Sequence, residues 1–112
     1  MNVKSEIKNL CRQIVENFNP QKIILFGSHA YGKPNADSDV DLLVVMPFEG
    51  SDSQKAVEIL LNLERTVPLD LLVRTSEQSR ERIEMEDFFM HEIIEQGKVL
   101  YESDNTGMDQ QS

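Results

Sequence analysis

Two aspartates, Asp39 and Asp41, stand one residue apart at the start of the apolar run Val40 to Met46. In a β-strand, residues two apart project from the same face about 7 Å apart along the backbone, so both carboxylates can converge on one ion. Two carboxylates this close repel each other by up to ~4 kcal/mol at an effective dielectric of roughly 20, and a cation offsets that repulsion. Mg²⁺ is the expected ion because it binds through one or two carboxylates plus substrate phosphates. The alternative for an isolated Asp-x-Asp pair is a solvated strand end.

A third aspartate, Asp70, stands in the same position in another apolar run, PLDLLV. If the two runs form neighbouring strands, three carboxylates gather at one end of the sheet. Three such groups can hold two metal ions about 3.5–4 Å apart, which clamp the attacking and leaving oxygens of a phosphoryl transfer. Asp70 is also placed to accept a proton from an attacking hydroxyl. Taken alone, Asp70 is equally consistent with a solvated strand start.

A Gly27-Ser28 pair follows the apolar run Lys22 to Phe26. Glycine at a strand-to-helix turn lets backbone N–H groups approach a phosphate closely, and a helix N-terminus favours anions. The Ser28 hydroxyl adds a donor, and Ser38 can add another. A Gly-Ser turn alone is usually structural, but this one precedes two carboxylates, eleven and thirteen residues after Ser28, and a third on another strand. The combination indicates a phosphate and metal site.

The elements that must position these residues follow from hydrophobic periodicity. The apolar runs predict strands over residues 22–26, 40–46 and 69–73, with a short strand over 99–101; residues 40–46 are apolar on both alternations, as in a central strand. Three- and four-residue spacing predicts a helix over residues 3–18, and a short helix follows at 28–31.

Two further helices are predicted in the second half of the chain. Ser51 and Gln54 have capping-box spacing, and the helix that follows has an apolar stripe of Ala56, Val57, Leu60 and Leu61. Residues 75–96 are predicted helical with a break near Arg82 and Gly97 as C-cap. The side chains expected to face inward there are Phe88, Phe89, Ile93 and Ile94.

The predicted fold class is α/β: a small mixed sheet of three to four strands packed with helices. At 112 residues the chain fits one domain, expected over residues 1–102, followed by a polar tail over 103–112 that we expect to be disordered. The net charge of −9, with 11 basic residues scattered among 20 acidic ones, argues against direct nucleic-acid binding. A single cysteine and the lack of a long apolar run predict a cytoplasmic protein that does not insert into membranes.

The run from Gly27 to Asp41, read as Gly-Ser, ten residues and Asp-x-Asp, resembles the DNA-polymerase-β-like nucleotidyltransferase superfamily. The stretch from Ile23 to Tyr101 resembles its minimal nucleotidyltransferases (MNT) more closely; these are small proteins usually encoded beside a HEPN-domain partner as a toxin–antitoxin pair. The resemblance implies the polymerase-β-like nucleotidyltransferase core.

The resemblance also implies roles for individual residues. Gly27 and Ser28 would hold the nucleotide triphosphate with Ser38 as a helper, and Asp39 and Asp41 would bind two Mg²⁺. Asp70 would complete the metal site and act as base. The implied reaction moves AMP from ATP to a hydroxyl, expected to be a tyrosine of the HEPN toxin, and silences its RNase activity.

The chain departs from the family pattern in the Gly-Ser turn. Many relatives carry an arginine there that can steady phosphate charge, whereas this chain has His29, Ala30 and Tyr31. His29 can donate to phosphate or face solvent, and Tyr31 can stack or pack.

At 112 residues we expect no helical acceptor-binding domain of the kind found in larger nucleotidyltransferases, so the acceptor surface is expected from another polypeptide in a hetero-oligomer. Two alternatives remain. One is a non-catalytic antitoxin that neutralises its partner by binding, and the other is a small-molecule nucleotidyltransferase that works with a separate helical subunit.

Overall fold

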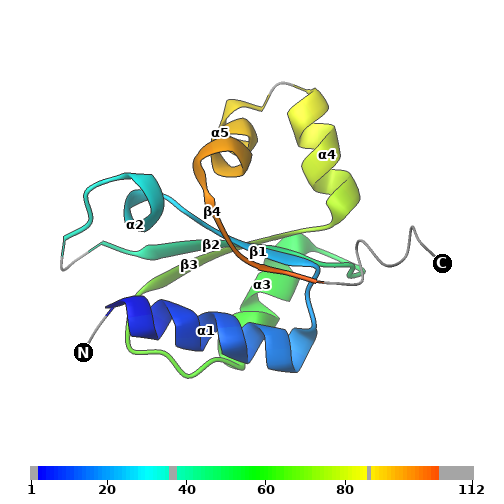
Figure 1. The fold of residues 1–112 in the computed structure, drawn as a ribbon. Helices are drawn as coiled ribbons and strands as arrows, with labels where there is room; N and C mark the ends of the chain where they lie inside the picture. The colour runs from blue at the N-terminus through cyan, green and yellow to red at the C-terminus, as the bar shows by residue number, and fades with distance from the viewer. Residues whose placement is uncertain (1–2, 36–37, 86, 104–112) are drawn as a thin grey trace.

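The computed structural model describes residues 3–35, 38–85 and 87–103 (Figure 1). Within them the strands are β1 (Lys22–Phe26), β2 (Val40–Val45), β3 (Leu69–Arg74) and β4 (Lys98–Glu102). The helices are α1 (Val3–Phe18), α2 (Ser28–Tyr31), α3 (Asp52–Leu61), α4 (Ser76–Glu84) and α5 (Phe88–Gln96).

One sheet holds the strands in the order β3-β2-β1-β4. β1 is antiparallel to both β2 and β4, whereas β2 and β3 are parallel and connected through α3. A parallel pair needs such a crossover, because its strands start at the same edge of the sheet. The predicted mixed sheet packed with helices is therefore confirmed, including the central position of β2 and the last short strand.

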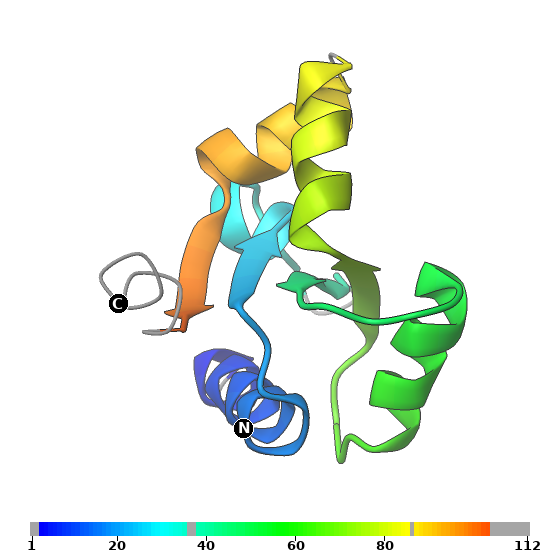
Figure 2. The same ribbon diagram turned by 90° about the vertical axis from the view of Figure 1, so that its right-hand side faces the viewer.

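Helices cover both faces of the sheet (Figures 1 and 2). α1 and α3 lie on one face, and α2, α4 and α5 lie on the other. The side chains of β2 alternate between the two cores: Leu42 and Val44 pack with the α1 side, and Leu43 and Val45 pack with Met90 and Ile93 of α5. Because residues two apart share a face, Asp41 points toward the same side as Leu43.

α1 forms as the apolar spacing predicts, with Ile7, Leu10 and Ile14 buried in one stripe. The helix ends at Asn19, whose backbone has a positive φ of 49° and whose N–H donates to the carbonyl of Val15. Asparagine tolerates this left-handed conformation, and the proline after it cannot continue a helix. Pro20 is itself buried beneath the sheet edge and starts the chain toward β1.

The predicted inward stripe of α3 is partly wrong. Ile59 is fully buried, while Val57 is 53% exposed and Leu61 is 80% exposed. Apolar residues occupy most of the circumference of this ten-residue helix, so periodicity alone does not choose the face. One of the two hydrogen bonds of the predicted capping box is confirmed, because the Ser51 hydroxyl accepts the N–H of Gln54.

The predicted orientation of α5 is also wrong for three residues. Met90 and Ile93 face the core, whereas Phe88, Phe89 and Ile94 are exposed. The physical reason is the position of the helix break, which falls after Glu84 and not near Arg82. Asp87 caps the new helix by accepting the N–H groups of Phe89 and Met90, and this start sets the rotation of the helix.

The chain end departs slightly from the prediction. Ser103 is buried, and its N–H donates to the carbonyl of Gln21, so it belongs to the folded part. The rest of the predicted tail, residues 104–112, lies outside the described residues. In the part of the chain that the structure describes, no helix is long and apolar enough to cross a membrane.

The faces of α3 can be tested by stability. Ile59→Ala is expected to lower the free energy of unfolding by about 2–5 kcal/mol, because it leaves a cavity in the core. Leu61→Ala is expected to change it by less than about 0.5 kcal/mol, because that side chain lies mostly in solvent. Urea unfolding of both variants measures the difference, and equal losses would contradict the observed orientation.

Candidate functional site

Asp41 and Asp70 lie side by side on the parallel strands β2 and β3, where they are register partners. The condition set by the sequence, that these two strands be neighbours, is therefore met. Asp41 is partly buried and Asp70 is exposed. The pKa of Asp41 is raised, first by burial and then by the negative charges of Asp70 and Asp39, with a hydrogen bond to Asp70 acting in the same direction; His29 acts to lower it.

Asp39 lies just before β2 and is exposed, close enough for its charge to act on Asp41. Among the described residues, no group of three His, Cys, Asp or Glu side chains is arranged to hold a metal ion by itself. The three carboxylates are thus neighbours but do not form a closed cage. Such an open set fits Mg²⁺, which usually keeps several waters and is completed by substrate phosphates.

Gly27 forms the turn between β1 and α2 with a positive φ of 76°. A Cβ at this position would lie 2.1 Å from Oδ2 of Asp41, so the Asp41 carboxylate rests against the bare backbone of the turn. Glycine is required here for both reasons, because other residues disfavour this φ and a side chain would displace the carboxylate. The structure therefore brings the Gly-Ser turn into direct contact with the Asp41 carboxylate.

The remainder of the turn is equally close-packed. The carbonyl of Gly27 accepts the N–H groups of Ala30 and Tyr31, which folds Ser28 and the next three residues into one helical turn. A Cβ on Gly32 would lie 2.8 Å from the Cα of Ser28. The spacing G-S-x-x-x-G thus reflects a compact turn that presents the partly buried Ser28 near Asp41.

Ser38 and His29 connect this turn to the loop before Asp39. The Ser38 hydroxyl accepts the N–H of Asn35 at 2.9 Å and lies 3.4 Å from the side-chain oxygen Oδ1 of Asn35. Nε2 of His29 is 3.3 Å from the carbonyl oxygen of Ser38. His29 is therefore directed at the loop backbone, and the Ser38 hydroxyl is engaged in a hydrogen bond within the loop. Residues 36 and 37, between Asn35 and Ser38, lie outside the described residues.

One interaction of the site has no signal in the sequence. The hydroxyl of Tyr31 donates to Oε2 of Glu92 at 2.8 Å and so joins α2 to α5. The pKa of Tyr31 is raised by burial and by Glu92, although a backbone hydrogen bond from Gly27 acts to lower it. The two residues are 61 positions apart, so no periodicity in the sequence predicts their pairing.

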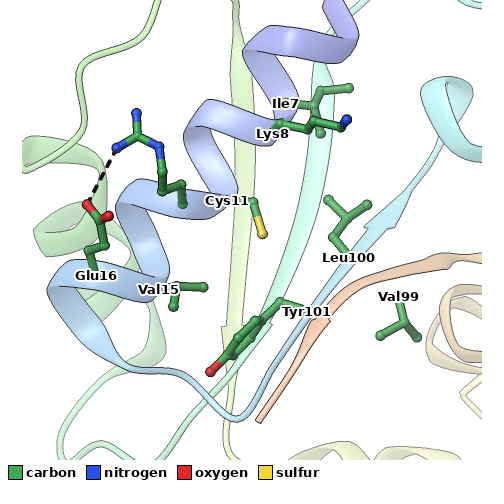
Figure 3. A pocket seen from close by; sticks show the side chains of 9 residues that line it. Ile7, Lys8, Cys11, Val15, Glu16, Val99, Leu100 and Tyr101 are labelled. Atoms are coloured by element: carbon green, nitrogen blue, oxygen red, sulfur yellow. Dashed lines mark ion pairs between the residues drawn. The ribbon is translucent and has the colours of Figure 1, made fainter.

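A separate groove of about 550 Å³ lies between α1 and β4 (Figure 3). Its lining includes Ile7, Cys11, Leu100 and Tyr101, and burial raises the pKa of the Cys11 thiol. α1 covers the sheet face opposite to the one that Asp41 points toward. The groove contains none of the three carboxylates and is distinct from the site described above.

Comparison with known proteins gives matches along nearly the whole chain. The family described as "Polymerase beta, Nucleotidyltransferase" matches residues 6–106. The "Putative protein adenylyltransferase MJ0604" of Methanocaldococcus jannaschii is 30% identical over 105 residues, which cover 90% of this chain and 100% of that protein.

Solved structures share the fold at lower identity. A "putative nucleotidyltransferase from Sulfolobus solfataricus" superposes with a TM-score of 0.63 at 16% identity, covering 91% of this chain and 87% of its own. A structure described as "the toxin-antitoxin with AMP-PNP" superposes with a TM-score of 0.56 at 21% identity, covering 92% of this chain and 77% of its own.

The raised pKa of Asp41 predicts a pH-dependent stability of the metal-free protein. Because the folded state binds this proton more tightly than the unfolded state, the free energy of unfolding falls as pH rises from about 4 through the raised pKa. Asp41→Asn removes the charge, so its Tm in EDTA is expected to exceed that of the wild type at neutral pH, with a smaller gap near pH 4.

Thermal unfolding followed by circular dichroism measures this gap. Glu58→Gln is the matched control, because Glu58 is an exposed carboxylate on α3 paired with Lys55 and remote from the site. A lower Tm for Asp41→Asn than for the wild type at neutral pH would contradict the assignment of electrostatic strain to Asp41.

Proposed function

Since this chain belongs to the polymerase beta nucleotidyltransferase family, we propose that it moves AMP from ATP to a hydroxyl of a HEPN-type RNase toxin and thereby acts as its antitoxin. The family match confirms the resemblance predicted from the Gly-Ser and Asp-x-Asp motifs. The observation that carries the proposal is the contact of the Asp41 carboxylate with both Asp70 and the bare turn at Gly27. The residues that we propose as metal ligands and the turn that we propose to bind phosphate are thereby adjacent.

The residues present fit divalent metal. Asp41 and Asp70 are adjacent and mutually repelling, and Asp39 adds a third charge. Mg²⁺ bound by Asp39, Asp41 and Asp70 would neutralise charge on the phosphates and polarise the α-phosphoryl group. Three carboxylates are enough to hold two ions, which is the number that the resemblance implies.

The nucleotide would bind with its triphosphate at the Gly-Ser turn. At Gly27 no side chain stands between the backbone and the Asp41 carboxylate, so a phosphate would come close to the backbone there. The Ser28 hydroxyl lies at the same turn as a further donor. Ser38 would contribute only after releasing its hydrogen bond with Asn35, and so we place it as a secondary contact.

Asp70 would act as the base. Asp70 is exposed on β3, an edge strand of the sheet, where an acceptor hydroxyl can reach its carboxylate. The acceptor oxygen forms a bond to the α-phosphorus as the bond to the bridging oxygen of the β-phosphate breaks. The hydroxyl proton passes to Asp70, and pyrophosphate leaves.

Two comparisons support a protein acceptor. The relative from Methanocaldococcus jannaschii, over whose full length this chain aligns, carries the name protein adenylyltransferase. The fold is also that of a toxin–antitoxin component solved with AMP-PNP. We therefore place the acceptor hydroxyl on a tyrosine of the toxin, in a hetero-oligomer that forms in the cytoplasm. Binding without catalysis, and transfer to a small molecule, are the two competing functions.

Labelling with α-³²P-ATP and Mg²⁺ tests the proposal on the purified toxin encoded beside this chain. The wild type is expected to label the toxin, and Asp39→Asn/Asp41→Asn is expected to abolish the label because metal binding is lost. Asp70→Asn is expected to lower the rate by about 10²–10⁴-fold, the range for loss of a general base.

Glu58→Gln again serves as the control and should label at the wild-type rate. If the toxin is neutralised equally by the wild type and by Asp39→Asn/Asp41→Asn while no label appears, the non-catalytic antitoxin is correct. If a small molecule is labelled and the toxin is not, the acceptor assignment is wrong.

A further inference from the structure

Three large apolar side chains are exposed around the start of α5: Met85 at 76%, Phe88 at 83% and Phe89 at 51%. We call these three residues the α5 apolar patch. Single exposed apolar side chains are ordinary, but neighbouring ones mark interaction surfaces more often than chance. The fold gains little from Phe88, because most of its ring stays in solvent.

The patch is connected to the carboxylate end of the sheet through one aromatic contact. The rings of Phe89 and Phe26 meet edge to face, with centroids 5.7 Å apart and an interplanar angle of 82°. Phe26 is the register partner of Asp41 on the neighbouring strand. α5 also lies on the sheet face toward which Asp41 points (Figure 1). A protein held at the patch would therefore lie on the same sheet face as Asp41.

The charge around the patch indicates which kind of molecule binds there. Among the residues from Arg80 to Gln96 that the structure describes, five are acidic and two are arginines. Asp87, which caps α5 between Met85 and Phe88, is itself paired with Arg82 at 3.6 Å. The exposed glutamates of α4 and α5 attract a basic surface and repel a triphosphate. The patch therefore fits a protein partner better than the nucleotide.

We propose that the α5 apolar patch is the docking surface for the acceptor protein, which meets it with a lysine- or arginine-rich surface around an apolar socket for Phe88. This inference rests on the proposed function, and it assigns the acceptor-binding role to a surface of this chain. Phenylalanine and methionine are both enriched in protein–protein interfaces relative to the rest of the surface.

The test uses the Phe88→Ala variant and the purified toxin whose gene lies beside the gene of this chain. It measures how tightly the variant binds the toxin and how fast it labels it. Its Kd for the toxin, from isothermal titration calorimetry, is expected to rise at least about tenfold, and the labelling rate at subsaturating toxin is expected to fall in proportion. Leu61→Ala is the matched control, because Leu61 is 80% exposed on α3, on the opposite face of the sheet. It should bind and label as the wild type does.

The outcomes separate this inference from the proposed function. If the wild type binds the toxin but does not label it, and Phe88→Ala binds more weakly, the docking surface is supported and the proposed reaction is wrong. If Phe88→Ala binds as tightly as Leu61→Ala, the docking surface is wrong whether or not label appears.

Two further results would also overturn the inference. One is a Phe88→Ala variant that binds toxin normally but binds MgATP more weakly, because the patch would then belong to the nucleotide site. The other is wild-type binding that does not weaken between low and high salt, because a basic partner surface requires that dependence.

Discussion

The parallel pairing of β2 with β3 holds Asp41 beside Asp70, and the rest of the site depends on that register. A slip of one residue would turn Asp41 to the opposite face, toward α1 and α3. The register is enforced by the apolar residues that follow, because Leu42 and Leu43 are fully buried in the two separate cores. Core packing thereby maintains two carboxylates in a contact that their charges oppose.

The turn at Gly27, which follows the neighbouring strand β1, makes room for the same Asp41 carboxylate. Phe26 is paired with Asp41, so the chain must turn directly above the carboxylate. Only a residue without a side chain leaves room for Oδ2 of Asp41. The absence of a side chain serves the packing of the metal-free protein, and under the proposed function it also lets a phosphate come close to the backbone. α5 is then fixed to this end by the Tyr31–Glu92 hydrogen bond and by the contact of Phe89 with Phe26.

Much of the fold could be predicted from the sequence, because strands buried on both faces and a strongly amphipathic first helix leave clear patterns. The three aspartates and the Gly-Ser turn were also found in the sequence. Their proximity depended on strand order, which the sequence left as a condition and the structure fulfils for Asp41 and Asp70. Their chemical roles are still proposals.

The errors lie in helix rotation. In α3, five apolar residues surround most of the helix, and contact with β3 selects Ile59. In α5, Phe88 and Phe89 were expected to face inward, whereas the helix begins only at Phe88 and turns Met90 and Ile93 to the core. The Asp87 cap determines the actual start, and it exposes the residues that we assign to acceptor docking. Tyr31 and Glu92 could not be paired in advance, because their contact is created by tertiary packing.

We propose that the carboxylates and the Gly-Ser turn together form one site for metal ions and nucleotide. Crystals grown with Mn²⁺ and a non-hydrolysable ATP analogue test it most directly, because Mn²⁺ gives an anomalous signal and replaces Mg²⁺ at oxygen ligands. The account predicts anomalous peaks within bonding distance of Asp39, Asp41 and Asp70, with the triphosphate against Gly27 and Ser28. A nucleotide bound elsewhere, such as in the groove between α1 and β4, with no peak at these carboxylates, would contradict it.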